Sequence, residues 1–289
     1  MIPLSYLREW SATAPWPDLR QVEQDLVISR ALCDLFSDPF LATRIAFRGG
    51  TAIHKLLFRK PLRYSEDIDL IQMRAEGIGL TVDAIRSALS WLGRCSREQA
   101  GHSIHLVFKF APEADASAKL KLKVEINTRE HESFLGTKEY RFGIENGWHR
   151  ATTAIRSFEP EELFATKLRA LLQRRKGRDL FDISEGLRQL TLDLDKLIAC
   201  FEHYLTMEGT QVTRAVAEQR MLEKLNRSLT EDIALLLPAG VSFTEEDGMA
   251  AFGKVWFDLI GRIQGEPWRL SAAAIEKVRR VRTPTFLQK

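Results

Sequence analysis

The sequence predicts an α/β (α+β) fold in which a mixed α/β half is followed by an all-helical half. Residues 118–127 alternate between apolar side chains on one side and lysine, glutamate and asparagine on the other, as in a half-buried strand. Beyond about residue 150 the apolar residues recur at helical spacing instead. A chain of 289 residues with 45% hydrophobic content lies near the upper limit for one core. We therefore expect two domains, 1–150 and 151–289.

The elements of the first half follow from periodicity and from residues that break it. An apolar stripe predicts a helix over 17–37, and a short strand at 45–47 ends at Gly49-Gly50. Thr51 can cap a helix that runs to about residue 58. Further expected elements are a strand at 63–72, a helix at 79–93 and strands at 103–110 and 118–127.

The second half is predicted to contain only helices. Pro160 and the two acids after it suit a helix start, because proline fits the first turn and acids favour the positive helix end. We expect Gly177 to stop this helix. A second helix follows to about residue 190, and others are expected at 193–205, 210–236 and 244–263.

Composition excludes several classes of protein. The cysteines at 33, 95 and 200 are odd in number and far apart, which indicates neither a disulfide framework nor a zinc site and favours the cytoplasm. The N-terminal residues lack the apolar run of a signal peptide, and no stretch is long enough to span a membrane. The net charge of +3 does not by itself indicate a nucleic-acid partner.

The strongest chemical feature is the pair of acids Asp67 and Asp69. In a strand both side chains point the same way, while Ile68 points to the core. Adjacent carboxylates repel each other unless a cation lies between them, and Mg²⁺ prefers such hard oxygen ligands. The alternative interpretation is a solvated polar strand face.

Two further features surround this pair. The turn Gly49-Gly50-Thr51 can bring backbone N–H groups and a hydroxyl close to phosphate oxygens; alternatively, it is a tight turn with a threonine N-cap. Glu125 lies on the polar face of the strand at 118–127 and can supply a third carboxylate to a pair of metal ions. Alternatively, Glu125 pairs with Lys121 or Lys123.

A basic segment covers residues 167–178. Lys167 emerges from an apolar helix stripe, so we expect it to point inward, toward the other domain, where a triphosphate would neutralise it; alternatively it reaches solvent at the stripe edge. Lys176 and Arg178 can neutralise phosphates during transfer, whereas Asp179 can be a simple helix N-terminal acid. We expect Arg174 and Arg175 to be solvated. Like the basic tail, they can also contact an RNA backbone; the tail residues are Lys277, Arg279, Arg280 and Arg282.

The segments FRGGTAIHKL, RYSEDIDL and KLRALLQRRKGRDLFD, in this order, resemble the motifs of the AbiEii-type nucleotidyltransferase toxins, the group that includes the MenT toxins. The resemblance covers residues 44–183. It implies a DNA-polymerase-β-like nucleotidyltransferase domain with a helical C-terminal domain. It also implies an enzyme that uses an NTP and Mg²⁺, with two ions expected.

The resemblance assigns roles to individual residues. The family's glycine–hydroxyl turn falls on Gly49, Gly50 and Thr51, its acid pair on Asp67 and Asp69, and its serine before the first acid on Ser65. Its basic motif falls on Lys167, Lys176, Arg178 and Asp179, with Asp182 one turn on. Ser65 is either a plain strand-entry serine or a phosphorylation site that switches the enzyme off. Glu125 is our own addition to the metal ligands.

Members of this family act as toxins associated with phage defence, and several resemble enzymes that add nucleotides to the tRNA acceptor end. The paired antitoxin is usually a winged-helix protein. We therefore expect transfer of a nucleoside monophosphate to RNA, most simply to the tRNA 3′ end, which blocks aminoacylation. The alternatives are a small-molecule or protein acceptor, and a non-catalytic module that binds RNA or the antitoxin.

Overall fold

The computed structural model describes residues 2–113, 115, 117–174 and 176–282, and side chains only as far as residue 276. The chain divides into two compact units. Unit 1 comprises Met1–Glu159 and Leu236–Val241, and unit 2 comprises Pro160–Leu235 and Ser242–Lys289. The division falls after residue 159, not at residue 150 as predicted from the sequence, because the strand Arg150–Phe158 pairs within the sheet of unit 1. No described helix is both long and apolar enough to cross a membrane.

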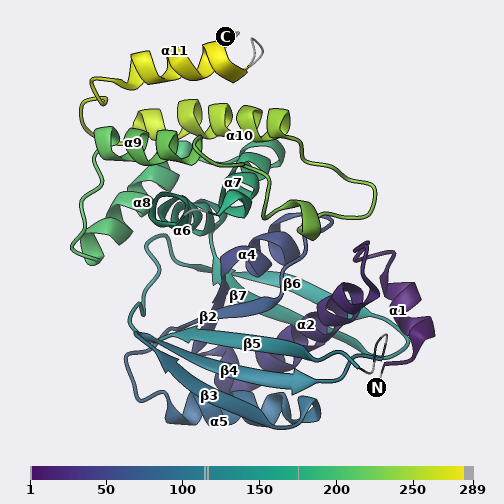
Figure 1. Cartoon of the computed structure of the whole chain (residues 1–289). Helices are drawn as coiled ribbons and strands as arrows, with labels where there is room; N and C mark the ends of the chain where they lie inside the picture. The colour runs from purple at the N-terminus through teal and green to yellow at the C-terminus, as the bar shows by residue number, and fades with distance from the viewer. Residues whose placement is uncertain (1, 114, 116, 175, 283–289) are drawn as a thin grey trace. The chain divides into compact units, whose positions relative to one another are not determined.

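Unit 1 is a sheet with helices against one face (Figure 1). Among the described residues the sheet has seven strands in the order β3-β4-β5-β2-β1-β7-β6. The pairs β2–β5 and β1–β7 are parallel, and the remaining neighbours are antiparallel. The strands are β1 (Ile45–Arg48), β2 (Asp67–Gln72), β3 (Cys95–Ala100), β4 (Ser103–Phe110), β5 (Leu120–Asn127), β6 (Thr137–Glu145) and β7 (Arg150–Phe158).

The main helix of unit 1 is α2 (Leu19–Ser37), which crosses the sheet and is buried along most of its length. Asp18 caps it by accepting a hydrogen bond from the backbone N–H of Arg20. Together with α5, this helix covers the apolar face of the sheet, where Ile68, Leu70 and Val124 are fully buried. The helical elements of unit 1 are α1 (Leu4–Trp10), α2 (Leu19–Ser37), α3 (Pro39–Ala42), α4 (Gly49–Ala52), the π-helix η1 (Ile53–Leu57), α5 (Gly79–Ala88) and the 3₁₀ turn η2 (Ser90–Leu92).

Unit 2 is helical, as predicted. Helix α6 packs on α7 and α8, and α7 also packs on α10. The capping box of Thr244 and Asp247 begins α10, since each side chain bonds the other's backbone N–H. The elements are α6 (Pro160–Gln173), α7 (Gly177–Gln189), α8 (Leu194–Met207), α9 (Arg214–Lys224), α10 (Glu245–Asp258) and α11 (Ser271–Arg282), with 3₁₀ turns at Ala234–Leu236, whose last residue belongs to unit 1, and at Ile260–Arg262.

Several sequence-based boundaries were wrong. The helix expected over 210–236 ends at Lys224, and the strands β3, β6 and β7 were not expected. Gly177 does not stop a helix but is the first residue of α7. A Cβ on Gly177 would lie 2.4 Å from the carbonyl oxygen of Leu229, so this glycine allows two backbone segments to approach closely.

Candidate active site

The acid pair lies on the open face at the start of β2. Asp67 and Asp69 are partly exposed, whereas Ile68 and Leu70 between and after them are buried on the opposite face. In the parallel pairing of β2 with β5, Asp67 lies opposite Lys123 and Asp69 lies opposite Glu125. The predicted alternation is therefore confirmed, and the sheet register adds the β5 side chains to the same face.

The glycine turn lies directly against the second acid. Gly49 has φ 81°, a value that L side chains rarely adopt. A Cβ placed on it would lie 2.0 Å from Oδ2 of Asp69 and 3.0 Å from its Cβ. Arg48, the residue before the turn, pairs with Asp69 in the β1–β2 ladder. The turn and the carboxylate are thus in contact, and any side chain at position 49 would fill the space that they share.

The structure decides one of the two roles considered for Thr51 from the sequence. It is not an N-cap, because α4 begins at Gly49 and has no side-chain cap. Its hydroxyl is buried, donates a hydrogen bond to the carbonyl oxygen of Asp67 at 2.6 Å and lies 2.7 Å from Oγ of Ser65. These bonds tie the turn to the start of β2, so Thr51 and Ser65 set the position of Asp67. Phosphate binding by the Thr51 hydroxyl stays a prediction.

Lys123 lies between two of the carboxylates. Its Nζ is 3.2 Å from Oδ2 of Asp67 and 3.2 Å from Oε2 of Glu125, and Nε2 of His105 on β4 is 3.3 Å from the same glutamate oxygen. Burial acts to lower the pKa of Lys123, but the negative charges of Asp67 and Glu125 outweigh burial and raise it. Burial acts to raise the pKa of Glu125, yet the hydrogen bond and charge of Lys123 hold it below its ordinary value.

The alternative in which Glu125 pairs with a neighbouring lysine is therefore the one found, with Lys123 as the partner. Within the described part of the chain, no three His, Cys, Asp or Glu side chains form a ready-made metal site. The chemistry of the donors still suits a divalent cation, since Asp67 and Asp69 offer carboxylate oxygens on one face and the absence of a side chain at Gly49 lets the turn approach Asp69 closely. Glu125 as a third ligand remains a prediction.

Buried polar contacts with helix α2 fix the segment that follows the Gly49 turn. The chain after it forms a π-helix, a rare form that often occurs at functional sites. Lys55 within it donates to Asp25 of α2 at 3.0 Å, and both side chains are nearly buried. The indole N–H of Trp10 donates to the same aspartate oxygen. This ion pair was not expected from the sequence, where a lysine among apolar helix residues was the available signal.

The basic motif lies in unit 2, and its first lysine, Lys167, is held in ion pairs. Nζ of Lys167 is 3.3 Å from Asp179 and 3.1 Å from Asp182, and its side chain is only 7% exposed. Carboxylates of its own unit thus neutralise Lys167, where a triphosphate had been expected. Arg174, expected to be solvated, donates two hydrogen bonds to Asp179, at 2.6 and 2.7 Å, although part of its side chain is exposed.

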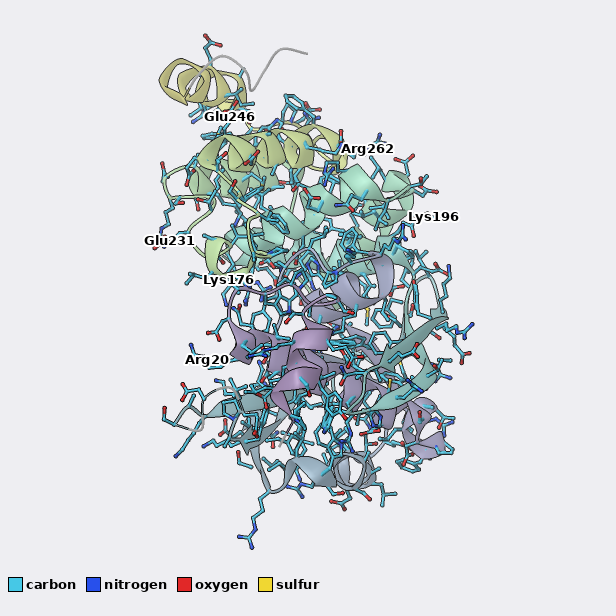
Figure 2. The ribbon with its side chains drawn as sticks, turned by 90° about the vertical axis from the view of Figure 1, so that its right-hand side faces the viewer. Arg20, Lys176, Lys196, Glu231, Glu246 and Arg262 are labelled. Carbon is cyan, nitrogen blue, oxygen red and sulfur yellow. The ribbon has the colours of Figure 1, made fainter. Side chains whose placement is uncertain are left out.

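Asp179 lies in the first turn of α7, as its simpler interpretation proposed, and it is also fully buried. Burial acts to raise its pKa, but the hydrogen bond from Arg174 and the charge of Lys167 hold it below the ordinary value. Lys176 is exposed on unit 2 (Figure 2), and the charge of Arg178 is the main cause of its lowered pKa. Arg175 and the side chains of the tail from Lys277 onward lie outside the described residues.

Unit 1 therefore brings together Gly49, Thr51, Ser65, Asp67, Asp69 and Glu125, and unit 2 brings together Lys167, Arg174, Asp179 and Asp182. A mixed sheet with an acid pair beside a glycine turn, followed by a helical unit, defines a nucleotidyltransferase-like protein. Residues 30–256 match the family described as "Nucleotidyl transferase AbiEii toxin, Type IV TA system". The chain belongs to this family of nucleotidyltransferase toxins of type IV toxin–antitoxin systems.

Solved structures share the fold. MenT4, a nucleotidyltransferase toxin from Mycobacterium tuberculosis H37Rv, superposes with a TM-score of 0.65 at 16% identity, over 97% of this chain and 96% of that one. JHP933 from Helicobacter pylori superposes with a TM-score of 0.52 at 16% identity, over 90% of this chain and 94% of that one. A comparison with curated proteins finds no match. The resemblance inferred from the motifs and the expected fold class are both confirmed.

Proposed function

We propose that this toxin transfers a nucleoside monophosphate from an NTP to an RNA hydroxyl, with the tRNA 3′ acceptor end as the acceptor, and so blocks aminoacylation and translation. The observation that carries the proposal is the contact between the Gly49 turn and the Asp69 carboxylate, with Asp67 on the same face of β2. Phosphoryl transfer needs the phosphate-binding turn and the metal-binding acids close to each other, because the reaction depends on positioning the phosphates and neutralising their charge. Membership of a nucleotidyltransferase toxin family supports the same reaction.

In this proposal different residues of unit 1 bind the metal, bind the phosphates and position the turn. Asp67 and Asp69 would hold Mg²⁺, with Glu125 as a further ligand, and the metal would supply charge neutralisation of the triphosphate and activation of the attacking hydroxyl. The backbone N–H groups at Gly49 and Gly50 are available to hold phosphate oxygens, since neither residue has a side chain in the way. Thr51 and Ser65 would keep the turn in register with Asp67 through the hydroxyl hydrogen bonds.

The basic motif of unit 2 remains part of the proposal. Lys176 is exposed and Arg178 partly exposed, so both can meet an anionic nucleotide or RNA. Lys167 and Asp179 are held in a buried ion-pair cluster, so we assign them to fixing the start of α7 and thereby the position of Arg178. A role for Asp179 in direct contact with the reacting groups stays a prediction.

A type IV toxin implies an antitoxin partner. We propose a winged-helix protein as this partner, a role in phage defence and the cytoplasm as the compartment, because tRNA is found there. All three depend on the reaction proposed above.

The decisive experiment is transfer of label from α-³²P NTPs to total tRNA in the presence of Mg²⁺. Asp67→Ala should abolish transfer while circular dichroism shows a folded protein. Glu66→Ala is the matched control, because it removes an exposed acid from the adjacent position. Transfer by Asp67→Ala at the rate of the control would refute the mechanism.

The same assay identifies the acceptor. Label that is released by RNase and mapped to RNA 3′ ends by sequencing supports the tRNA proposal. Label that survives RNase but is removed by protease, or that appears in small molecules, would replace RNA with another acceptor. Toxicity that persists in Asp69→Ala cells would point to a non-catalytic binding module.

A further inference from the structure

Lys123 lies between two carboxylates of the proposed metal site, although the proposed reaction gives this lysine no role. Its Nζ lies at the same distance, 3.2 Å, from Oδ2 of Asp67 and from Oε2 of Glu125. The cross-strand register explains this, since Lys123 is opposite Asp67 and two residues before Glu125 on the same strand face. A positive charge therefore already lies between two of the carboxylates that would bind a metal ion.

The surroundings give this contact weight. The side chain of Lys123 is 27% exposed and those of Asp67 and Glu125 are 34% and 33% exposed, so water screens the cluster only in part. Without a cation, Asp67, Asp69 and Glu125 would repel one another across neighbouring strands. The lysine ammonium relieves this repulsion. In a metal-bound state the ammonium has to leave the carboxylates. The long flexible side chain of Lys123 allows this without any movement of the backbone.

We propose that Lys123 is an internal cation of the acidic site: it holds Asp67 and Glu125 in the metal-free protein, and a divalent cation has to displace it to bind these carboxylates. The inference rests on the proposed function for the identity of the metal-binding face. Two cations cannot share the same carboxylate oxygens at low cost, so lysine and metal compete. Lys123 thus acts as a positioning residue that sets how much free metal the toxin needs.

The test measures Mn²⁺ binding without nucleotide, by the electron paramagnetic resonance signal of free Mn²⁺. We expect Lys123→Met to bind Mn²⁺ about tenfold more tightly than the wild type, because it removes the competitor from both carboxylates. Lys121→Met is the matched control: it removes the same charge from the same strand face two residues earlier, at an exposed position. Its affinity should stay within about twofold of the wild type.

A second readout follows the metal-free protein. Lys123→Met should melt at a lower temperature than Lys121→Met without metal, and added Mn²⁺ should raise its melting temperature more than that of the control. Adding Asp67→Asn to Lys123→Met should remove the gain in affinity. Lys123→Gln, which keeps a hydrogen-bonding side chain, provides the same comparison if the methionine variant does not fold.

Mn²⁺ affinity in Lys123→Met or Lys123→Gln no tighter than in Lys121→Met would overturn the inference, whatever the transfer assay shows. Conversely, a gain in affinity that depends on Asp67 would support it even if no NMP transfer to RNA is detected. Failure of the inference about Lys123 and failure of the proposed function are therefore distinguishable, because metal competition is measured without NTP and transfer is measured with it.

Discussion

Replacing Gly49 with alanine tests whether the contact between the turn and the acid pair matters for transfer. Two penalties apply. Alanine at φ 81° costs about 1–2 kcal/mol in backbone strain. Its Cβ would also lie 2.0 Å from Oδ2 of Asp69, whereas ordinary contacts begin at 3.4 Å. The carboxylate or the turn must therefore move by more than 1 Å.

Displacements of about 1 Å at reacting groups can cost about 100-fold in rate. We therefore expect Gly49→Ala to lose at least about 100-fold in NMP transfer, measured with α-labelled NTP and total tRNA. The matched control is Gly93→Ala, since Gly93 has φ 83° but no atom within 4 Å of its added Cβ. Urea unfolding of both variants gives the strain cost of each substitution.

The comparison separates strain from displacement. Both variants should lose free energy of unfolding, and only Gly49→Ala should lose transfer per folded molecule. Equal transfer by Gly49→Ala and Gly93→Ala would show that the space beside Asp69 has no part in the reaction, and the assignment of the turn would fail with it.

Two further predictions concern unit 2. Asp179→Asn should lower the free energy of unfolding by about 3 kcal/mol at pH 7, because it leaves buried and partly buried cations without their shared carboxylate. The folded-state pKa of Asp179 is below its ordinary value, so the stability that its carboxylate contributes is present above about pH 4 and is lost as the pH falls through the folded-state pKa. Urea titrations at several pH values should therefore show that acid lowers the free energy of unfolding less in the variant than in the wild type. The same dependence of unfolding free energy on pH in both proteins would contradict this. Gly177→Ala should destabilise by about 1–3 kcal/mol, because its Cβ would meet a backbone carbonyl oxygen at 2.4 Å. Gly79→Ala, also at the first position of a helix but with open space around its Cβ, should be neutral or slightly stabilising; similar unfolding free energies for the two variants would refute the steric argument.

The sequence was most informative where local alternation determines orientation. The same-face placement of Asp67 and Asp69 and the buried position of Ile68 follow from the two-residue period of a strand, and the structure confirms both. The strand β6 could also have been found, because Tyr140, Phe142 and Ile144 alternate along it. The strand β3, CSREQA, shows no such pattern and exists through its pairing with β4.

Roles that depend on a distant partner were not predictable in the same way. Lys167 on an apolar helix stripe was expected to seek a phosphate, but Asp179 and Asp182 from the next helix neutralise it. Thr51 was expected to offer its hydroxyl to a ligand, and the structure uses that hydroxyl to bind the backbone of Asp67. In both cases the sequence identifies a polar side chain, while tertiary packing fixes the partner that this side chain bonds.

The parallel register of β2 and β5 shows why this matters for the whole site. A shift by one residue would place Leu122 or Val124 opposite Asp67 and turn one strand's carboxylates toward the core. Gln24 of α2 opposes such a shift, since its buried amide donates to the carbonyl oxygens of Glu66 and Lys121, one at the start of each strand. A glutamine on a packing helix thus helps to hold Asp67, Lys123 and Glu125 in register. Gln24 belongs to no recognisable sequence motif, so its role in fixing the register can be identified only from the structure.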